Sequence, residues 1–377
     1  MLNNSLMNFD SKIEKIIFYN FPTILFCLIP IFLITGPFLS DLSISLIGLL
    51  FFFHCVKNKD FSYFKNKYFY FFLIFWIYLI LNTLINNFNL DSLKISFFYF
   101  RYAFFVIAIV ALLDVEDKFI KYFFYSIFLC FLVLIFDGFY QYFVGKNILG
   151  WETHNRVSSL FGDEKILGSY LARLWPIFFG LYIILFKKKN ILFPLFISTF
   201  ILSEVLIFIS GDRTAFFYIN LSAIFVIMFS SGLAKLRLIT LLSSIVLIVI
   251  ISIVNPTAKQ RVINQTFDQM NLTDEKKRKE EGLYIFSKEH THHYITAYRM
   301  YMDNFILGVG VKNFRKFCSE EKYVESKLSC ASHPHNTYLQ LLSETGSIGF
   351  IFLIIILIYF FKNIITHLRY RLKRKYF

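Results

Sequence analysis

The chain has 377 residues, of which 57% are hydrophobic and 51 are phenylalanine, and its mean hydropathy is +0.59. A soluble domain of this length does not bury so much apolar surface, and the sequence lacks the alternating strands of an outer-membrane barrel. The net charge of +14 would suit a nucleic-acid-binding protein if the chain were soluble, but the positive charges cluster in short segments between apolar runs. The sequence therefore predicts an all-α, polytopic membrane protein that binds no nucleic acid.

Apolar runs of about 20 residues, enough for a helix to cross about 30 Å of hydrocarbon, recur along the chain. The first run lacks a small-residue cleavage site, so we expect a retained span rather than a signal peptide. A long polar segment, residues 255–333, precedes the last run. We predict about ten transmembrane helices, near residues 18–36, 41–56, 68–86, 96–113, 119–143, 167–186, 190–210, 214–231, 236–254 and 336–361.

Lysine and arginine in the short loops predict the orientation of these spans. If the N-terminus is cytoplasmic, that side carries the lysine run 187–189, Arg237 and the basic tail 362–377. On the opposite side, the short loops 37–40 and 87–95 hold only Lys94. Both termini are therefore expected to be cytoplasmic, and the segment 255–333 is expected to face outward.

The outward segment holds two of the five cysteines, Cys318 and Cys330, shortly before the last apolar run. In an oxidising compartment they could pair and close the base of the loop, although their spacing alone leaves this open. No cysteine or histidine spacing resembles a zinc site. His290, His292 and His293 lie close together in the sequence, and we expect them to line a solvated face.

Arginines mark the predicted outer surface. Arg213 lies in the turn 210–214 between two closely spaced apolar runs. Positive charge is disfavoured there as a topological flank, so Arg213 is predicted to hold an anion. Arg299 lies on a predicted amphipathic helix, 294–305, and Arg156 lies in another outward loop. For these two arginines a solvated loop charge is the alternative interpretation.

Two more arginines, Arg101 and Arg173, fall within predicted spans. Ionisable side chains inside a membrane usually face the bundle interior or a wet cavity. Either arginine could pair with Asp137 or another acid, and both would also suit the polar path of a transporter.

His335 is the strongest candidate for a catalytic residue. Pro334 predicts a helix start, because proline is favoured at the first helical position. The helix dipole would then favour the neutral, proton-accepting imidazole of His335. The 26 residues back from Phe361 (361 − 335) span about 39 Å as a helix, against about 30 Å of hydrocarbon. His335 is thus expected at headgroup depth, where the diphosphate of a lipid-linked substrate would lie; the alternative is a histidine that only caps a span.

A neutral histidine with outward arginines, and no acidic metal cluster, predicts one type of reaction. A guanidinium can donate two parallel hydrogen bonds to phosphate oxygens, so it can hold a departing diphosphate. The histidine can remove the proton from an incoming hydroxyl.

The pair His335–Asn336, followed after nine residues by Gly346, resembles the signature of the O-antigen ligase and polymerase superfamily. The turn 210–214 resembles the arginine turn of this superfamily. Arg299 resembles the arginine of its arginine helix, and Gly308 and Gly310 resemble its Gly-x-Gly segment. The resemblance covers roughly residues 150–355, with two departures: bulky residues around Phe305 replace a common proline, and only one span follows His335. Its remaining motif residues are Val309, Asn313 and Phe314, with Arg156, Phe161, Gly162 and Asp163 in a looser upstream pattern.

The resemblance implies a metal-independent, inverting glycosyltransferase without a cofactor, built as a type C-like helical bundle in the bacterial inner membrane. Its active site would be periplasmic, with His335, Arg213 and Arg299 as catalytic residues and Arg156 and Asn336 as substrate-binding residues. The donor would be a glycan on undecaprenyl diphosphate, and the acceptor lipid A-core or another glycan. We favour a ligase over an O-antigen polymerase or a protein O-oligosaccharyltransferase; a transporter is the non-enzymatic alternative.

By this interpretation the chain has three parts. Residues 1–150 form N-terminal transmembrane helices. Residues 151–361 form the ligase-like region, including the periplasmic loop 255–333, and residues 362–377 form a basic cytoplasmic tail.

Overall fold

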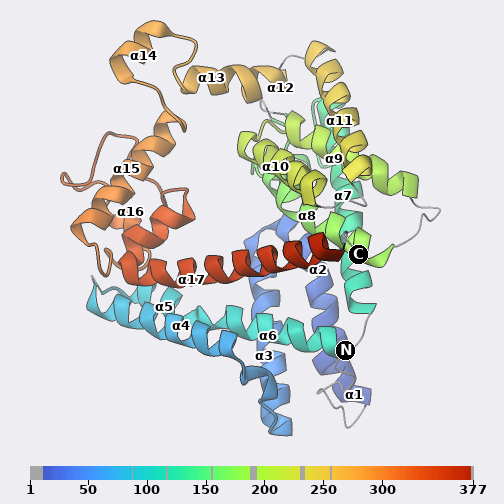
Figure 1. Ribbon diagram of the computed structural model, residues 1–377, viewed down its shortest axis with the longest axis vertical. Helices are drawn as coiled ribbons and strands as arrows, with labels where there is room; N and C mark the ends of the chain where they lie inside the picture. Colours follow the sequence, from blue (N-terminus) through green and yellow to red (C-terminus); the bar gives the residue numbers. More distant parts are fainter. Residues whose placement is uncertain are drawn as a thin grey trace. The chain divides into compact units, whose positions relative to one another are not determined.

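A computed structural model of the chain describes residues 12–86, 88–115, 118–153, 156–186, 193–229, 234–254 and 257–374. These residues form helices joined by turns and loops (Figure 1). Within them, β-pairing is limited to one isolated bridge between Lys146 and Glu152. The predicted all-α, polytopic class is confirmed.

Each of the ten predicted apolar runs corresponds to helical structure. In the described part of the chain, eight helical segments are long and apolar enough to cross a membrane. Two apolar helices, α9 and α10, are shorter, with 17 residues each. The first run corresponds to α1 (Lys12–Lys15) and α2 (Phe21–Thr35), which belong to one continuous helical segment. The other nine runs correspond to α3 (Pro37–Asn58), α4 (Lys67–Ile85), α5 (Leu90–Phe98) with α6 (Phe100–Val115), α7 (Lys118–Val144), α8 (Leu167–Leu185), α9 (Phe193–Ile209), α10 (Arg213–Phe229), α11 (Ala234–Val254) and α17 (Thr337–Arg374).

The chain folds into two compact units, and each unit combines two separate stretches of sequence. Unit 1 consists of Met1–Lys59 and Phe105–Thr266, and unit 2 of Asp60–Phe104 and Phe267–Phe377.

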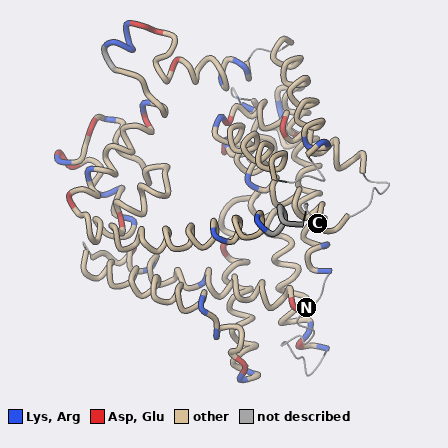
Figure 2. The backbone as a smooth tube through the Cα atoms, in the orientation of Figure 1, with Lys and Arg blue, Asp and Glu red and all other residues tan. Residues whose placement is uncertain are grey.

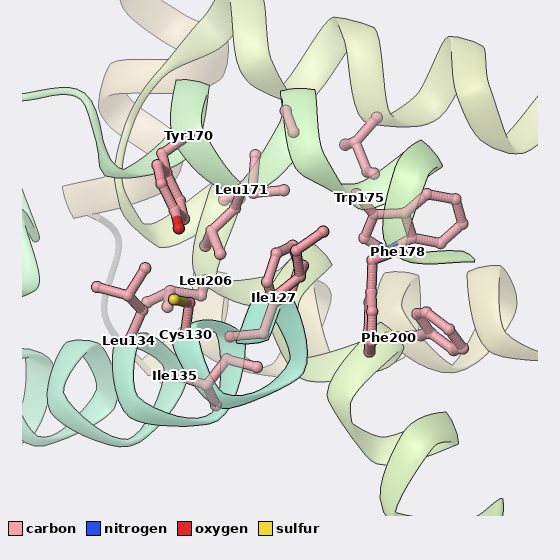
Figure 3. Packing of buried hydrophobic residues seen from close by; sticks show 14 of the residues in the cluster. Ile127, Cys130, Leu134, Ile135, Tyr170, Leu171, Trp175, Phe178, Phe200 and Leu206 are labelled. Atoms are coloured by element: carbon pink, nitrogen blue, oxygen red, sulfur yellow. The ribbon is translucent and has the colours of Figure 1, made fainter. Parts of the chain in front are cut away.

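The core of unit 1 lies where α7, α8, α9 and α10 pack together (Figure 3). Aromatic rings fill much of it: the Phe124 and Phe178 rings stack with centroids 5.3 Å apart. α7 and α9 approach closely at Gly138, where a Cβ atom would lie 2.8 Å from the Leu206 side chain. Such tight contacts matter within a membrane, because lipid surrounds apolar side chains as favourably as protein does, so close packing contributes to the association of the helices.

A buried ion pair crosses unit 1. Arg237, counted above among the cytoplasmic loop charges, is instead 1% exposed on the first turn of α11. It forms an ion pair with Glu204 of α9, and its guanidinium lies 4.4 Å from the centroid of the Trp175 ring. The Ser244 hydroxyl donates a hydrogen bond to the same carboxylate (2.5 Å). Buried charges persist when they are paired in this way, so Arg237 stabilises the bundle.

Unit 2 contains residues 267–333 of the polar segment that precedes α17. Its charges concentrate on α14 (Glu275–Glu281) and its surroundings (Figure 2). The predicted amphipathic helix is α15 (Lys288–Asp303), which packs against α17. Beyond α15, a short helix, α16 (Phe314–Phe317), leads to Cys318, and a disulfide joins this residue to Cys330, as their spacing allowed.

The Gly-x-Gly segment, 308–310, crosses a break in α17. The Val309 N–H donates a hydrogen bond to the Ser343 carbonyl oxygen (2.8 Å). Three residues later, Gly346 adopts a φ of 62°, and a Cβ atom there would collide with the Ile306 carbonyl group. Only glycine combines this conformation with this close approach. The motif glycines therefore fix the direction of the first turns of α17, which follow His335.

Candidate active site

His335 is exposed and lies just before the last helix. It has a left-handed φ of 55°, and α17 begins at Thr337. Asn336 is the N-cap: its Oδ1 accepts hydrogen bonds from the second and third N–H groups of the helix (3.0 and 3.2 Å). The predicted start at Pro334 was therefore wrong, because an asparagine cap satisfies free N–H groups that a proline start leaves unpaired. His335 still lies at the positive end of the helix dipole.

Three further histidines surround the ring of His335. The centroid of that ring lies 4.3 Å from His333, 5.4 Å from His293 and 5.5 Å from His290. The expectation that residues 290–293 line a solvated face was wrong for His292 and His293, which are 9% and 8% exposed. Packing of α15 against α17 buries this side of the helix and brings two of its histidines to His335.

In unit 1, Arg213 is the first residue of α10. The preceding Asp212 caps the helix: its Oδ1 accepts a hydrogen bond from the Ala215 N–H (3.0 Å), and its Oδ2 accepts one from the Ser169 hydroxyl (2.8 Å). The Arg213 guanidinium donates a long hydrogen bond to Thr266 Oγ1 (3.4 Å). Both oxygens of the Asp212 carboxylate are therefore engaged in holding the turn.

Arg261 lies over this turn, although no sequence motif singles it out. A Cβ atom on Gly211 would lie 2.7 Å from Cδ of Arg261, so the glycine makes room for the arginine side chain. The neighbouring Val262 is buried against Phe208 of α9, which fixes the segment in place. The Nε atom of Arg261 is buried and has no hydrogen-bond partner.

Arg156, Arg213 and Arg261 form a group that we call the arginine cluster. Burial lowers the pKa of the partly buried Arg156, the charges of Arg261 and Arg213 lower it further, and Asp212 opposes them. Arg213 and Arg261 thus lie close enough to Arg156 for their charges to act on it. Guanidinium groups gathered in this way suit an anion with several negative charges, such as a diphosphate.

The structure places Arg299 in unit 2, in a different environment. Its guanidinium forms an ion pair with Glu325 and donates a hydrogen bond to the Val324 carbonyl oxygen (2.9 Å). Arg299 thereby ties α15 to the loop closed by the disulfide. Its diphosphate-binding role stays a prediction, as does the substrate-binding role of Asn336, whose Oδ1 caps α17.

The polar residues expected inside the spans serve local contacts. Asp137 of α7 accepts hydrogen bonds from the Ser159 hydroxyl (2.6 Å) and the Ile148 N–H (2.9 Å), so it anchors the loop between α7 and α8. The Arg101 guanidinium lies over the Tyr102 ring, 4.9 Å from its centroid, and Arg173 is exposed on α8.

Over the described ranges, no set of three or more histidine, cysteine, aspartate or glutamate side chains is arranged to hold a metal ion. The imidazoles around His335 are close neighbours without that arrangement.

A family model matches the part of the chain that contains His335, Arg213 and Arg261. Residues 197–354 match the family model described as O-antigen ligase. These residues form an O-antigen ligase family region. No curated protein matches the chain. The O-antigen ligase region includes His335, Arg213 and Arg261, whereas Arg156 precedes it.

An apolar groove runs along α8 and α10, the helix that starts at Arg213. Its volume is about 450 Å³. The lining residues are Pro176, Phe179, Gly180, Ile183, Leu221, Ser222, Phe225, Val226 and Phe229. In this O-antigen ligase region, α10 thus carries a cationic group at one end and apolar groove residues farther along.

Proposed function

We propose that this chain is an O-antigen ligase that transfers a glycan from undecaprenyl diphosphate to a hydroxyl of lipid A-core at the periplasmic membrane face. The proposal combines the family match with the chemistry of the two groups described above. The arginine cluster is the observation that carries it, because grouped guanidinium groups can bind the phosphate oxygens of an anionic donor and would offer nothing to a neutral or cationic cargo.

In the proposed reaction, the arginine cluster binds the diphosphate of the donor. His335 accepts the proton of the acceptor hydroxyl as its oxygen forms a bond to the anomeric carbon. The bond between this carbon and the diphosphate oxygen breaks with inversion, and undecaprenyl diphosphate leaves with its added negative charge stabilised by arginine. The proton on His335 then passes to solvent, to which the ring is exposed.

The groove along α8 and α10 supports a lipid-borne donor. An isoprenoid chain needs an apolar surface beside the site that holds its diphosphate. α10 offers both features: Arg213 is its first residue, and its residues from Leu221 to Phe229 line the groove, beginning about 12 Å farther along the helix. We therefore assign the groove to the first isoprene units of the donor.

The test replaces the chromosomal gene with a His335→Ala variant in a strain that makes O-antigen, after membrane insertion is verified. For a ligase, we expect lipid A-core without O-chain, with polymer accumulating on the carrier. Core bearing single repeats would indicate a polymerase, and loss of glycan from proteins alone would indicate a protein glycosyltransferase. An unchanged lipopolysaccharide ladder would overturn the proposal and favour a transporter.

A further inference from the structure

His293 combines burial with an unpaired nitrogen beside His335. Its side chain is 8% exposed, and its Nδ1 atom is buried without a hydrogen-bond partner. An unpaired buried nitrogen costs free energy, so such an atom calls for an explanation. The rings of His293 and His335 have centroids 5.4 Å apart. Two imidazoles joined by an N–H···N hydrogen bond have centroids about 5 Å apart, since about 3 Å separates the nitrogens.

Charges around the two rings decide which of them can accept a hydrogen bond. Burial lowers the pKa of His293, and the nearby His335, His290 and His292 lower it further, whereas Glu289 opposes them. His293 is thus neutral at neutral pH and offers a lone pair.

His333 stands on the other side of His335. Burial lowers its pKa too, and His335, Lys312 and Arg315 add to the shift. Its Nδ1 atom already forms a hydrogen bond with the Ser332 hydroxyl (2.8 Å). Of these two neighbours of His335, His293 is therefore the one with a buried nitrogen still unpaired.

We propose that His293 is a positioning residue for His335, whose ring donates a hydrogen bond to the unpaired nitrogen of His293 when it takes the acceptor proton. This inference rests on the proposed function. A base oriented by a third group is the general arrangement of nucleophile–base pairs. His293 receives the hydrogen bond and keeps its protonation state, so the proton stays on His335 until it leaves to solvent.

The chain offers a matched control on the same helix. His292 is also buried, at 9% exposure, and both of its ring nitrogens lack hydrogen-bond partners. The ring contacts of His335 in the described structure are made by His290, His293 and His333. His292→Phe therefore removes a buried imidazole from α15 without removing a ring that contacts His335.

The experiment uses the full chain in vesicles that contain undecaprenyl-diphosphate-linked glycan and lipid A-core from the host strain. We expect His293→Phe to lower kcat for glycan transfer about tenfold to a hundredfold, with the donor KM unchanged, since orientation of the base is lost. His293→Gln keeps a hydrogen-bond acceptor and should recover part of the rate, and His292→Phe should keep it.

The pH profile separates positioning from a structural role. The lowered pKa of His293 means that it protonates only on acidification, and protonated His293 cannot accept the hydrogen bond. The protonation of His293 should therefore contribute to the loss of wild-type activity on the acid side, and this contribution should be missing in His293→Phe.

Two results would overturn the inference: equal rates and acid limbs in His293→Phe and His292→Phe, or no recovery in His293→Gln. If His335→Ala abolishes transfer while His293→Phe resembles the control, only this inference fails. If His335→Ala keeps full transfer, both the proposed function and the inference about His293 are wrong.

Discussion

Arg237 and Arg261 lie in the same unit, and both have buried side-chain nitrogens, but the charges around them differ. Arg237 has an ion-pair partner in Glu204 and an aromatic ring beside it. Arg261 lies with two other arginines around a single aspartate whose oxygens are engaged elsewhere. An arginine in a membrane protein thus becomes a ligand candidate only where its charge lacks compensation from the protein.

The largest expected effect is on stability at the compensated arginine. Arg237→Ala leaves the Glu204 carboxylate buried without its cation, so the free energy of unfolding should fall by about 3–5 kcal/mol. Thermal unfolding of the purified protein in detergent measures this loss. The double variant Arg237→Met with Glu204→Gln should recover much of the stability, because neither charge remains. If the Arg237→Ala protein is stable but has no transfer activity, Arg237 binds the substrate, and the contrast drawn between Arg237 and Arg261 is wrong.

Removal of the Arg261 side chain should weaken donor binding instead of stability. Arg261→Ala should weaken donor binding by about 1.5–3 kcal/mol, the contribution of a hydrogen bond to a charged group, and leave stability unchanged. The measurement is the donor KM in vesicles. Arg278→Ala is the control, since it removes an arginine that pairs with Glu275 on the surface of α14. An equal KM in the two variants would remove Arg261 from the anion site.

A smaller effect on glycan transfer is expected when lysine replaces Arg213, because the positive charge stays and the shape of the charged group changes. Arg213→Lys preserves the positive charge but loses the planar fork that binds two phosphate oxygens, so transfer should fall about tenfold, or about 1.4 kcal/mol. The lipopolysaccharide ladder and the rate in vesicles both report this loss. Full activity in this variant would show that Arg213 acts as a point charge.

Arg299 should show the smallest effect. An anion would have to displace the Glu325 carboxylate from its guanidinium, so Arg299→Ala should reduce transfer less than tenfold, below about 1.4 kcal/mol. Loss of this partly exposed pair should lower stability by less than about 1 kcal/mol. Glu325→Gln is the control: equal small changes in both variants support a structural pair. A large loss of transfer in Arg299→Ala alone would assign Arg299 to the diphosphate.

Part of the candidate site could be predicted because its signals are local. The Asn336–Gly346 spacing and the turn before Arg213 are short stretches whose glycines and caps constrain the backbone directly. The helix start at Pro334 was predicted wrongly because Asn336, two residues later, caps the helix and accepts hydrogen bonds from two of its first N–H groups.

The sequence carries no such local signal for contacts between distant segments. Nothing in the sequence near Arg261 indicates that it lies over Gly211, fifty residues earlier (261 − 211), and nothing near His293 indicates that it faces His335. Both contacts depend on how segments that are distant in the sequence pack together, which the pattern of apolar residues within one segment does not specify.

The sequence by itself determined that this is a bundle of membrane helices with an O-antigen ligase region, because lipid demands long apolar helices and the motif residues are neighbours in the chain. The tertiary structure alone decided which charges are compensated. It paired Arg237 with Glu204, brought Arg213 and Arg261 close to Arg156 and placed the buried imidazole of His293 beside His335. The physical reason is that electrostatic interactions depend on distance and burial, and only the packed helices fix these quantities.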